Sequence, residues 1–428
     1  MAFPRRVAIV AANRIPFAKS NTAYFGVSNQ KMLTAALNGL VEKNSLQGQE
    51  LGEVVAGAVM KHSRDFNLVR ESVLDTQLSA ATPCTDMQQA CGTGLQAIFS
   101  VANKIALGQM ESGIAGGVDT TSDAPIAVSD KFRGMLLDLN RSKTLGQRLK
   151  VLTSFRPSFL LPALPRNGEP RTGLSMGGHT ELTAKRWSIE RAAQDELAFN
   201  SHQKLHAAYE SGFMDDLVSP FNGLEKDNLL RPQTTVEKLA SLGAAFDKNN
   251  GTLSAGNSSA LTDGASVVLL ASEEWAKERG LPVLAYITDF QTSAVDFIGK
   301  DSNYKEELLL APAYAVPKML ARNNLSLQDF DFYEIHEAFA AQVLATLKAW
   351  GDDSFCIERL GLNGALGEID MNKLNVNGSS LATGHPFAAT GGRITGNLAK
   401  LLNQKGSGRG LISICAAGGQ GVVALLEK

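Results

Sequence analysis

The chain has 428 residues, 44% of them apolar, and its 41 lysines and arginines nearly balance its 43 aspartates and glutamates. This length allows two or more packed cores, and this composition excludes a disordered chain, a collagen helix and a coiled coil. A formal charge of -2 provides no overall attraction to nucleic acid. No apolar run approaches the roughly 18 to 20 residues that a membrane-spanning helix needs. We therefore expect a soluble protein without a nucleic-acid partner.

Strand-like and helical segments alternate near both ends of the chain. In the first part, strand patterns at 7–17 and 53–61 are each followed by a helical pattern, at 28–43 and at about 67–80. The same order returns late in the chain, with strand patterns at 283–293 and 330–340 and helical patterns at 311–324 and 340–350. This alternation is typical of an α/β fold.

The two ends also share a longer pattern, in which a glycine-bearing turn precedes an amphipathic helix and then a strand. The first copy is ACGTGLQAIFSVANKIALGQ followed by SGIAGGVDTTS, and the second is TGHPFAATGGRITGNLAKLLNQKG followed by RGLISICAAGGQG. Duplication would give two similar sheets related by a pseudo-two-fold axis, with Cys91 and His385 close to it. The alternative is that any α/β protein repeats strand and helix patterns.

A segment of different composition separates the copies. We expect an N-terminal half at 1–124 whose core continues at about 256–275, an inserted loop domain at 125–255 and a C-terminal half at 276–428. Asn250-Gly251 within the insert suggests a hairpin at 246–256 with a type I′ turn. Residues 131–171 hold nine lysines or arginines and two acids among leucine-rich segments. This stretch suits a membrane surface, a partner, substrate phosphates or a solvated helical face.

Four polar or sulfur-bearing residues stand out as candidates for catalysis. Cys91 begins a helical stretch, where a helix N-terminus lowers a thiol pKa and favours the nucleophilic thiolate. His385 lies in ATGHP, an exposed turn from which it could act as a general base. His336 closes an apolar strand beside Glu337, which is either its orienting partner or a helix N-terminal acid. Cys415 ends the strand GLISIC before a turn of small residues.

A metal or dinucleotide site is not supported by the spacing of these residues. No pair among the cysteines and histidines has the short separation typical of zinc ligands. The sequence has no G-x-x-x-x-G-K-[ST], and no G-x-G-x-x-G follows the first expected strand. The four cysteines are too few and too irregularly spaced to suggest a disulfide framework. We therefore expect the protein in a reducing compartment. We expect no metal and no cofactor.

Taken together, the motifs resemble those of the thiolase family, and most closely its degradative 3-ketoacyl-CoA thiolases of fatty-acid β-oxidation. The resemblance is carried by the Cys91 turn, HEAFA at 336–340, GHPFAATGGR at 384–393 and CAAGGQG at 415–421, in that order. It extends from VAIVAANRIPF to the C-terminus and includes SMG at 175–177 and LSAGNSSALTDGAS at 253–266. It implies a duplicated five-layered fold, α-β-α-β-α, with an inserted loop domain over the CoA groove.

The resemblance also implies roles for individual residues. Cys91 would accept the acyl group, His385 would activate it, and Cys415 would exchange a proton with the α-carbon of the acetyl unit. His336 with His385 would form one oxyanion hole, and the amides of Cys91 and Ala417 a second. CoA, a substrate rather than a cofactor, would be contacted by Met176, Arg231, Ala255, Ser259, Ala338 and Phe339.

Three positions depart from the common family pattern. Many biosynthetic members have Asn where this chain has His336, which favours degradation of longer acyl chains. Ala416 and Ala417 replace glycines in the turn after Cys415, and His179 stands where a smaller residue is usual in the CoA groove.

Three other functions are alternatives to a degradative thiolase. The first is a short-chain acetyl-CoA acetyltransferase, and the second is a decarboxylating ketoacyl-carrier-protein synthase, which needs no second cysteine. The third is a non-catalytic acyl-CoA or lipid carrier.

Partners and location follow from the resemblance alone. It implies a homodimer or a dimer of dimers, and a possible hydratase–dehydrogenase partner subunit or peripheral membrane contact through 131–171. The basic N-terminus superficially resembles an import sequence, but its apolar run at 7–12 suits a first strand better. We expect a cytoplasmic protein if the source is bacterial and a mitochondrial matrix protein if it is eukaryotic.

Overall fold

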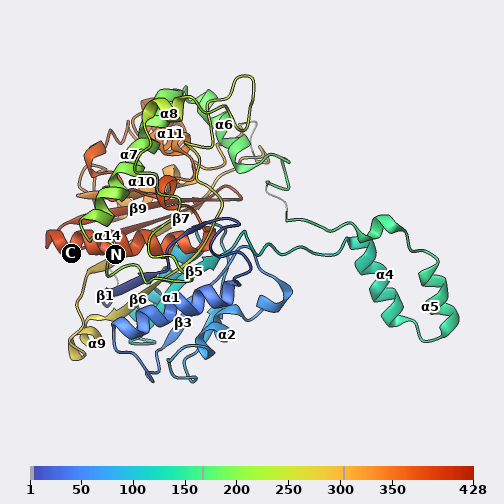
Figure 1. Cartoon of the computed structure of the whole chain (residues 1–428). Coiled ribbons are helices and arrows are strands. Elements are labelled where there is room, and N and C mark those ends of the chain that lie inside the picture. Colours follow the sequence, from blue (N-terminus) through green and yellow to red (C-terminus); the bar gives the residue numbers. More distant parts are fainter. Residues whose placement is uncertain (1–3, 166–167, 302–303) are drawn as a thin grey trace.

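The described residues, 4–165, 168–301 and 304–428 of this computed structural model, form a ten-stranded sheet in which two halves join edge to edge (Figure 1). The strand order is β4-β3-β5-β6-β1 in the first half and continues as β7-β10-β9-β8 in the second. The first half contains β1 (Val7–Arg14), β3 (Glu53–Ala56), β4 (Cys84–Asp86), β5 (Ser112–Asp119) and β6 (Thr262–Ser272), with the short β2 (Ala18–Lys19) beside β6. The second contains β7 (Ala285–Ala294), β8 (Phe332–Ile335), β9 (Arg409–Ala416) and β10 (Gln420–Glu427).

The two halves repeat one pairing pattern, as the expected duplication requires. Strands β1, β6, β5 and β3 correspond to β7, β10, β9 and β8, with two antiparallel pairings followed by a parallel one in each half. An isolated parallel bridge between Tyr333 and Leu374 occupies the place of the β3–β4 pairing. The two similar sheets are not separate, however, because β1 and β7 pair over residues 7–9 and 285–287.

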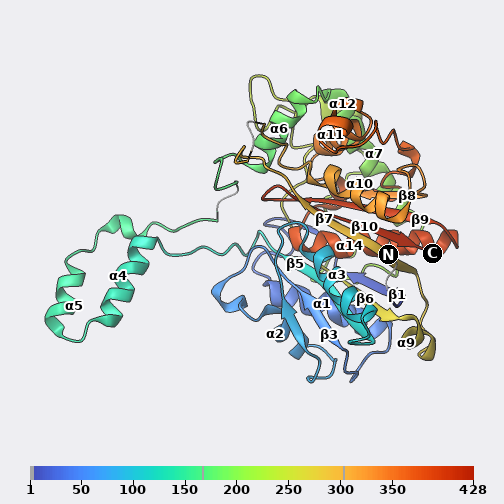
Figure 2. The same cartoon turned by 180° about the vertical axis from the view of Figure 1, so that it is seen from behind.

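Helices form three layers around these half-sheets, which confirms the α-β-α-β-α arrangement (Figures 1 and 2). The first outer layer holds α1 (Asn29–Lys43) and α2 (Leu68–Leu74), and the other holds α10 (Ala311–Asn323) and α11 (Ala340–Trp350). Between the half-sheets lie α3 (Thr93–Ala106) and α14 (Thr390–Lys405). Three hydrophobic cores fill the spaces between layers. The short helices are α9 (Glu273–Glu278), α12 (Asp353–Glu358) and α13 (Ser380–Thr383).

Strand β1 shows why the central strands have almost continuous apolar sequences. Successive side chains of a strand point to opposite faces of the sheet. Val7 and Ile9 therefore belong to the central core with α3 and α14, whereas Ala8 and Val10 belong to the core beneath α1 and α2. All residues of β6 are buried for the same reason. Strands covered on both faces lose the polar alternation of a half-exposed strand.

The segment between the halves has two parts that behave differently. Helices α4 (Asp130–Arg141) and α5 (Leu145–Leu152) form an arm that projects away from the body of the molecule (Figures 1 and 2). Helices α6 (Met176–Arg186) and α7 (Arg191–Glu210) instead pack on the C-terminal half, where Ala184 and Leu197 join its outer core, and α8 (Val236–Ala240) lies on α7. Within the described residues, no helix is both long and apolar enough to cross a membrane.

Four local predictions from the sequence are wrong. The strand expected at 330–340 is β8 only over Phe332–Ile335. Strand β3 ends at Ala56 rather than near residue 61, because the amides of Val59 and Met60 donate to the Asp119 carboxylate instead of a neighbouring strand. Helix α2 ends at Leu74, and the polar residues after it form turns. Neither Asn250 nor Gly251 has the positive φ of a type I′ turn, since the amides of residues 249–251 bond to Asp247.

Helices α3 and α14 approach so closely that only glycine fits at their contact. A Cβ on Gly391 would lie 2.2 Å from the backbone nitrogen of Leu95, and one on Gly94 would lie 2.4 Å from the carbonyl oxygen of Ala388. Both clashes are with backbone atoms, which cannot move aside as a flexible side chain can. The approach of these helices therefore depends on both glycines.

We expect Gly391→Ala to lower the melting temperature by several degrees, because overpacking at such a contact costs about 1–3 kcal/mol or more. The control is Gly134→Ala in α4, where an added Cβ has no atom within 4 Å. There alanine should be neutral or slightly stabilising, since glycine inside a helix costs about 0.5–1 kcal/mol. Differential scanning calorimetry of both variants tests this. Equal melting temperatures would contradict the proposed close contact.

Candidate active site

Cys91 lies in a strained turn directly before α3. Ala90 adopts φ +46°, a left-handed conformation that is rare for alanine. Thr93 supports this turn, because its hydroxyl accepts from the amide of Gln89 at 2.8 Å and donates to the carbonyl of Ala90 at 2.7 Å. The strained backbone and the threonine together fix the position of the Cys91 sulfur.

The second half of the chain brings His385 to this sulfur. The expected exposed turn is wrong, because His385 is buried, with 6% of its surface exposed. The distance between His385 Nε2 and Cys91 Sγ is 3.0 Å. His385 Nδ1 is 2.7 Å from Thr390 Oγ1, and the His385 amide donates to Thr262 Oγ1 at 2.6 Å. If Nε2 accepts the thiol proton, Nδ1 carries the ring proton and donates it to Thr390. The imidazole is therefore oriented as a base toward Cys91.

Asp119, at the end of β5, connects the loop after β3 to the loop that follows His385. It is fully buried, and its carboxylate accepts from the amides of Val59 and Met60 in the first half and from the amide of Ala388 in the second, the last at 2.9 Å. Burial raises the pKa of Asp119 to about 7, although these three amides oppose the shift. Asp119 therefore fixes the loop after His385 relative to the N-terminal half.

Burial dominates the electrostatics of the nucleophile and its base. It raises the pKa of Cys91 to about 12, and the amides of Ala417 and of Cys91 itself, which point toward the sulfur, offset only part of this effect. It lowers the pKa of His385 to about 3, with a further contribution from Arg393. The expected lowering of the thiol pKa by the helix N-terminus is therefore wrong. At neutral pH the resting pair is a thiol and a neutral imidazole.

Cys415 and His336 complete the catalytic candidates, but their positions differ. Cys415, at the end of β9, is 1% exposed, and burial together with the nearby Cys91 raises its pKa well above the usual value. His336 follows β8 and is fully buried, with its ring centroid 4.1 Å from that of His385 and Nδ1 2.8 Å from Ser380 Oγ. Glu337 does not orient His336; its carboxylate accepts from the amide of Leu381 in the first turn of α13, among other donors.

Most of the expected residues meet in one cleft of about 760 Å³. Its wall is largely apolar, and Phe246 and Leu309, which the sequence did not single out, contribute to it. His336 does not line this cleft and lies behind His385. The expected residues that do line it are Cys91, Met176, Ser259, Ala338, Phe339, His385, Cys415 and Ala417.

Arg231 and Ala255 lie outside this cleft. Arg231 is exposed and lines a second cavity of about 830 Å³ with Lys238, Leu239 and Leu242, among others. Ala255 is exposed on the turn between the two cavities. The next residue, Gly256, lies against the side chains of Leu239 and Leu242. A Cβ added to it would lie only 2.6 Å from the first and 2.7 Å from the second. The turn therefore links the Cys91 cleft to the cavity beside Arg231.

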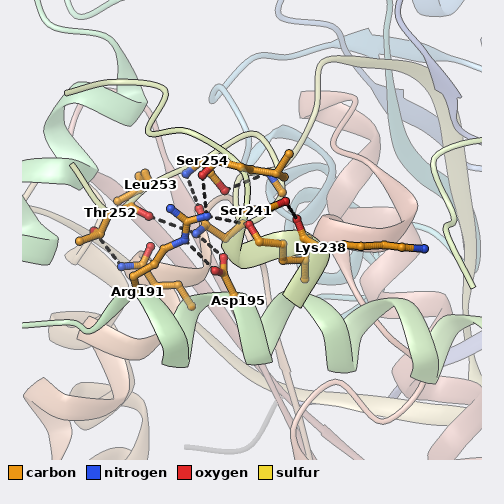
Figure 3. A network of polar contacts seen from close by, with 12 residues as sticks. Arg191, Asp195, Lys238, Ser241, Thr252, Leu253 and Ser254 are labelled. Atoms are coloured by element: carbon orange, nitrogen blue, oxygen red, sulfur yellow. Dashed lines mark hydrogen bonds and ion pairs between the residues drawn. The ribbon is translucent and has the colours of Figure 1, made fainter. Parts of the chain in front are cut away.

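A buried polar network centred on Asp195 holds this turn against α7 and α8 (Figure 3). Asp195 accepts from Arg191 Nε at 2.7 Å and from Asn257 Nδ2 at 2.9 Å. Arg191 also donates to the carbonyl oxygens of Leu239 and Leu242, which fixes the end of α8. Nothing in the sequence signalled this network, because its members are far apart along the chain.

His179, which stands where a smaller residue is usual, does not line the Cys91 cleft. Its Nε2 is 2.7 Å from Thr172 Oγ1, and its ring lies edge-on to Phe297 in a neighbouring cavity.

Three residues of the site could together bind a metal ion. Cys91, His336 and His385 place one potential ligand atom each within 4.8 Å of the others. Two of these atoms already make the 3.0 Å contact between sulfur and imidazole.

Comparisons with known proteins identify the family of the chain. The family model for the thiolase N-terminal domain matches residues 7–274, and that for the thiolase C-terminal domain matches residues 281–428. The chain belongs to the thiolase family. It is 41% identical to a 3-ketoacyl-CoA thiolase of Shewanella sediminis over 99% of this chain and 97% of that protein. It is 42% identical to the same enzyme of Pectobacterium carotovorum over 99% of this chain and 96% of that protein.

Solved thiolase structures cover the whole chain as well. Human mitochondrial 3-ketoacyl-CoA thiolase is similar with a TM-score of 0.81 at 28% identity, covering 100% of both chains. A structure of that enzyme in complex with CoA gives the same TM-score over 100% of this chain and 99% of the other. An acetyl-CoA acetyltransferase of Bacillus anthracis has a TM-score of 0.79 at 32% identity, covering 99% of this chain and 98% of that one.

The protonation state of Cys91 predicts how this thiolase reacts with iodoacetamide. With a thiol pKa of about 12, the thiolate fraction, and hence the alkylation rate, should rise about tenfold per pH unit between pH 7 and 10. Peptide mass spectrometry after timed labelling measures the rate at Cys91 alone. A rate that stays constant across this range would instead indicate a thiolate–imidazolium pair.

Proposed function

We propose that this thiolase cleaves 3-ketoacyl-CoA with CoA, giving acetyl-CoA and a shortened acyl-CoA in fatty-acid β-oxidation. The observation that carries the proposal is the 3.0 Å contact between Cys91 Sγ and His385 Nε2 at a cleft that Cys415 also lines. It supplies a soft nucleophile, a neutral base and a second proton carrier in one place. The bacterial relatives that match over full length, named 3-ketoacyl-CoA thiolases, support the same reaction.

In the first half-reaction, Cys91 attacks the ketone carbon while His385 Nε2 takes its proton. The resulting alkoxide collapses, the bond between the α and β carbons breaks, and its electron pair forms the enolate of acetyl-CoA. Cys415 then donates its proton to the α-carbon, which releases acetyl-CoA and leaves the shortened acyl group as a thioester on Cys91. The raised pKa of Cys415 suits this step, because it keeps the thiol protonated at neutral pH.

The second half-reaction returns both protons. The incoming CoA thiol gives its proton to the Cys415 thiolate and attacks the thioester on Cys91. Cys91 leaves as a thiolate and recovers its proton from the His385 imidazolium, so the resting state is restored. The amides of Ala417 and Cys91 point toward the Cys91 sulfur and are proposed to hold the thioester oxygen. His336 and His385 are proposed to form the other oxyanion hole.

The two cavities suit the two parts of a CoA thioester. The apolar walls formed by Met176, Ala338 and Phe339 are proposed to contact the pantetheine arm and the acyl group, with Ser259 as a polar contact. Arg231 and Lys238 in the second cavity offer positive charge for the CoA phosphates, and Ala255 lies on the turn between them. A solved thiolase of the same fold is a complex with CoA, which supports CoA as a ligand of this thiolase.

A short-chain acetyl-CoA acetyltransferase is the second candidate, because a structure with that name matches the full chain at 32% identity. A long-chain enzyme is the interpretation suggested by His336. A non-catalytic carrier would bind acyl-CoA without any dependence on Cys91 or Cys415. These three functions differ in chain-length preference and in their response to cysteine substitutions.

The test is a thiolysis assay with 3-ketohexadecanoyl-CoA and acetoacetyl-CoA, in which formation of acetyl-CoA is followed by chromatography. We expect a higher kcat/KM for the longer substrate. Cys91→Ala should reduce activity at least about 10³-fold, because the covalent route is lost. Cys415→Ala should reduce the rate while acyl transfer to Cys91 remains possible. Preference for acetoacetyl-CoA would favour the short-chain candidate, and activity unaffected by Cys91→Ala would exclude the covalent mechanism.

We also propose that the arm formed by α4 and α5 contacts an anionic membrane surface. Residues 130–156 carry seven lysines or arginines and two aspartates. The arm also exposes several large apolar side chains, and the combination is typical of interfacial helices. These side chains are Leu136, Leu137, Leu145, Leu149, Leu152 and Phe155.

Vesicle flotation with phosphatidylserine-containing liposomes tests the arm. The triple variant Arg148→Gln, Lys150→Gln, Arg156→Gln should bind roughly 100-fold more weakly, since each basic residue near such a surface contributes about 1 kcal/mol. The matched control replaces the exposed Lys31, Lys277 and Lys318 with Gln and should bind as the wild type does. Equal binding by both variants, or binding only to a hydratase–dehydrogenase subunit, would contradict the membrane proposal.

The assembly and location of this thiolase remain proposals as well. We propose a homodimer or a dimer of dimers, in keeping with the family resemblance, and light scattering coupled to size-exclusion chromatography would measure its mass. The two relatives compared by sequence are bacterial, whereas one solved structure of the same fold is human and mitochondrial. We propose a cytoplasmic location for a bacterial source and the mitochondrial matrix for a eukaryotic one.

A further inference from the structure

A chain of hydrogen bonds leads from a buried arginine to His336. Arg393, on α14, is 2% exposed, and its Nη2 donates to Ser380 Oγ at 2.9 Å and to Ser379 Oγ at 3.1 Å. Ser380 Oγ is in turn 2.8 Å from His336 Nδ1. Ser379 makes no hydrogen bond to either histidine of the site in the described part of the chain. Only Ser380 therefore connects the guanidinium to His336.

The direction of each bond in this chain follows from the chemistry of its members. A guanidinium has donors and no acceptor, so Arg393 can only donate to Ser380. Burial lowers the pKa of Arg393 to about 10, which leaves it charged at neutral pH. The single proton of the Ser380 hydroxyl is then available, and among the described residues His336 Nδ1 is the acceptor within reach. When Ser380 donates this proton, Nδ1 is the unprotonated nitrogen of His336, whereas the reverse arrangement would leave the buried hydroxyl proton without an acceptor in the described segments.

This assignment leaves the ring proton of His336 on Nε2. The imidazole is neutral, because burial, His385 and Arg393 all lower its pKa. Nε2 is buried and has no hydrogen-bond partner in the described part of the chain. A buried donor without an acceptor destabilises the fold by about 1–3 kcal/mol. An oxygen atom of a bound ligand would satisfy this donor. One nitrogen of this ring lies within 4.8 Å of Cys91 Sγ and of a ring nitrogen of His385.

We propose that Ser380, held by Arg393, is a positioning residue that fixes His336 as the Nε2–H tautomer, so that this N–H donates to the substrate oxygen directly or through a water. The inference rests on the proposed thiolase reaction for its purpose, whereas the tautomer itself is independent of any substrate. Without the Ser380 hydroxyl, Nδ1 loses its donor, and the ring can place its proton on either nitrogen. A ring with the proton on Nδ1 would present a lone pair to an oxyanion and would repel it.

The test combines NMR and kinetics on the full-length enzyme. The protein has six histidines, and ¹⁵N labelling of the imidazoles with two-bond ¹H–¹⁵N correlation distinguishes the two neutral tautomers. His336→Gln assigns the signal. We expect the wild type to show protonated Nε2 and unprotonated Nδ1 at His336. Ser380→Ala should shift this signal toward a mixture and lower kcat about 10- to 100-fold with little change in KM, somewhat less than the loss of a whole oxyanion donor.

The matched control is Ser379→Ala, which removes the neighbouring hydroxyl that also accepts from Arg393. It should keep the Nε2–H tautomer and a kcat within about threefold of the wild type. A protonated Nδ1 in the wild type would overturn the proposal without any variant, and so would a Ser380→Ala enzyme with unchanged tautomer and kcat. Equal losses in both serine variants would indicate general disruption and would also overturn it. Absence of thiolysis by the wild type would contradict the proposed function and leave the tautomer measurement valid.

Discussion

The contact between Cys91 and His385 is the interaction on which the rest of the structure depends. Its two residues come from different halves of a duplicated fold, so the 3.0 Å distance requires the halves to be fixed relative to each other. The glycine contacts between α3 and α14 bring the two loops together. The buried carboxylate of Asp119 and the hydrogen bond from Ser266 Oγ to the carbonyl of Ala389 then fix the loop that follows His385.

Burial at this junction determines the chemistry that is available. A partly buried sulfur and a buried imidazole are both more stable in their neutral forms, and the helix N-terminus is too weak to reverse this for Cys91. Neutral His385 can therefore act as a base only when the sulfur attacks. Cys415, held protonated by the same burial, can supply a proton to a carbanion. In the proposed reaction, two cysteine thiols and one imidazole thus transfer the protons within the site, and the CoA thiol replaces the proton that Cys415 gives to acetyl-CoA.

The sequence allowed the fold and the reacting groups to be predicted, because both leave local signals. The strand and helix periods, with the repeated glycine turn, predicted a duplicated α/β fold, and the motifs around Cys91, His385 and Cys415 singled out residues that meet in one cleft. The supporting groups leave no such signal. Asp119 ends a strand like many others, and Thr390 and Ser380 acquire their roles only through neighbours in space.

Some predictions failed for the same physical reason. The end of β3 depends on amides that bond to Asp119, which is about sixty residues away in the sequence, rather than on the strand pattern of residues 53–61. The thiol pKa of Cys91 depends on how deeply the second half of the chain buries the sulfur, which a local helix signal does not report. Contacts between residues far apart in the sequence thus determine the end of β3 and the pKa of Cys91, and local sequence patterns do not report such contacts.

Trapping the acyl-enzyme would show directly whether Cys91 is the nucleophile. The enzyme would be incubated briefly with 3-ketohexadecanoyl-CoA without free CoA and analysed by intact-protein mass spectrometry with peptide mapping. The account predicts a tetradecanoyl adduct on Cys91 that disappears when CoA is added. An adduct on another residue, or no adduct with either this substrate or acetoacetyl-CoA, would contradict it.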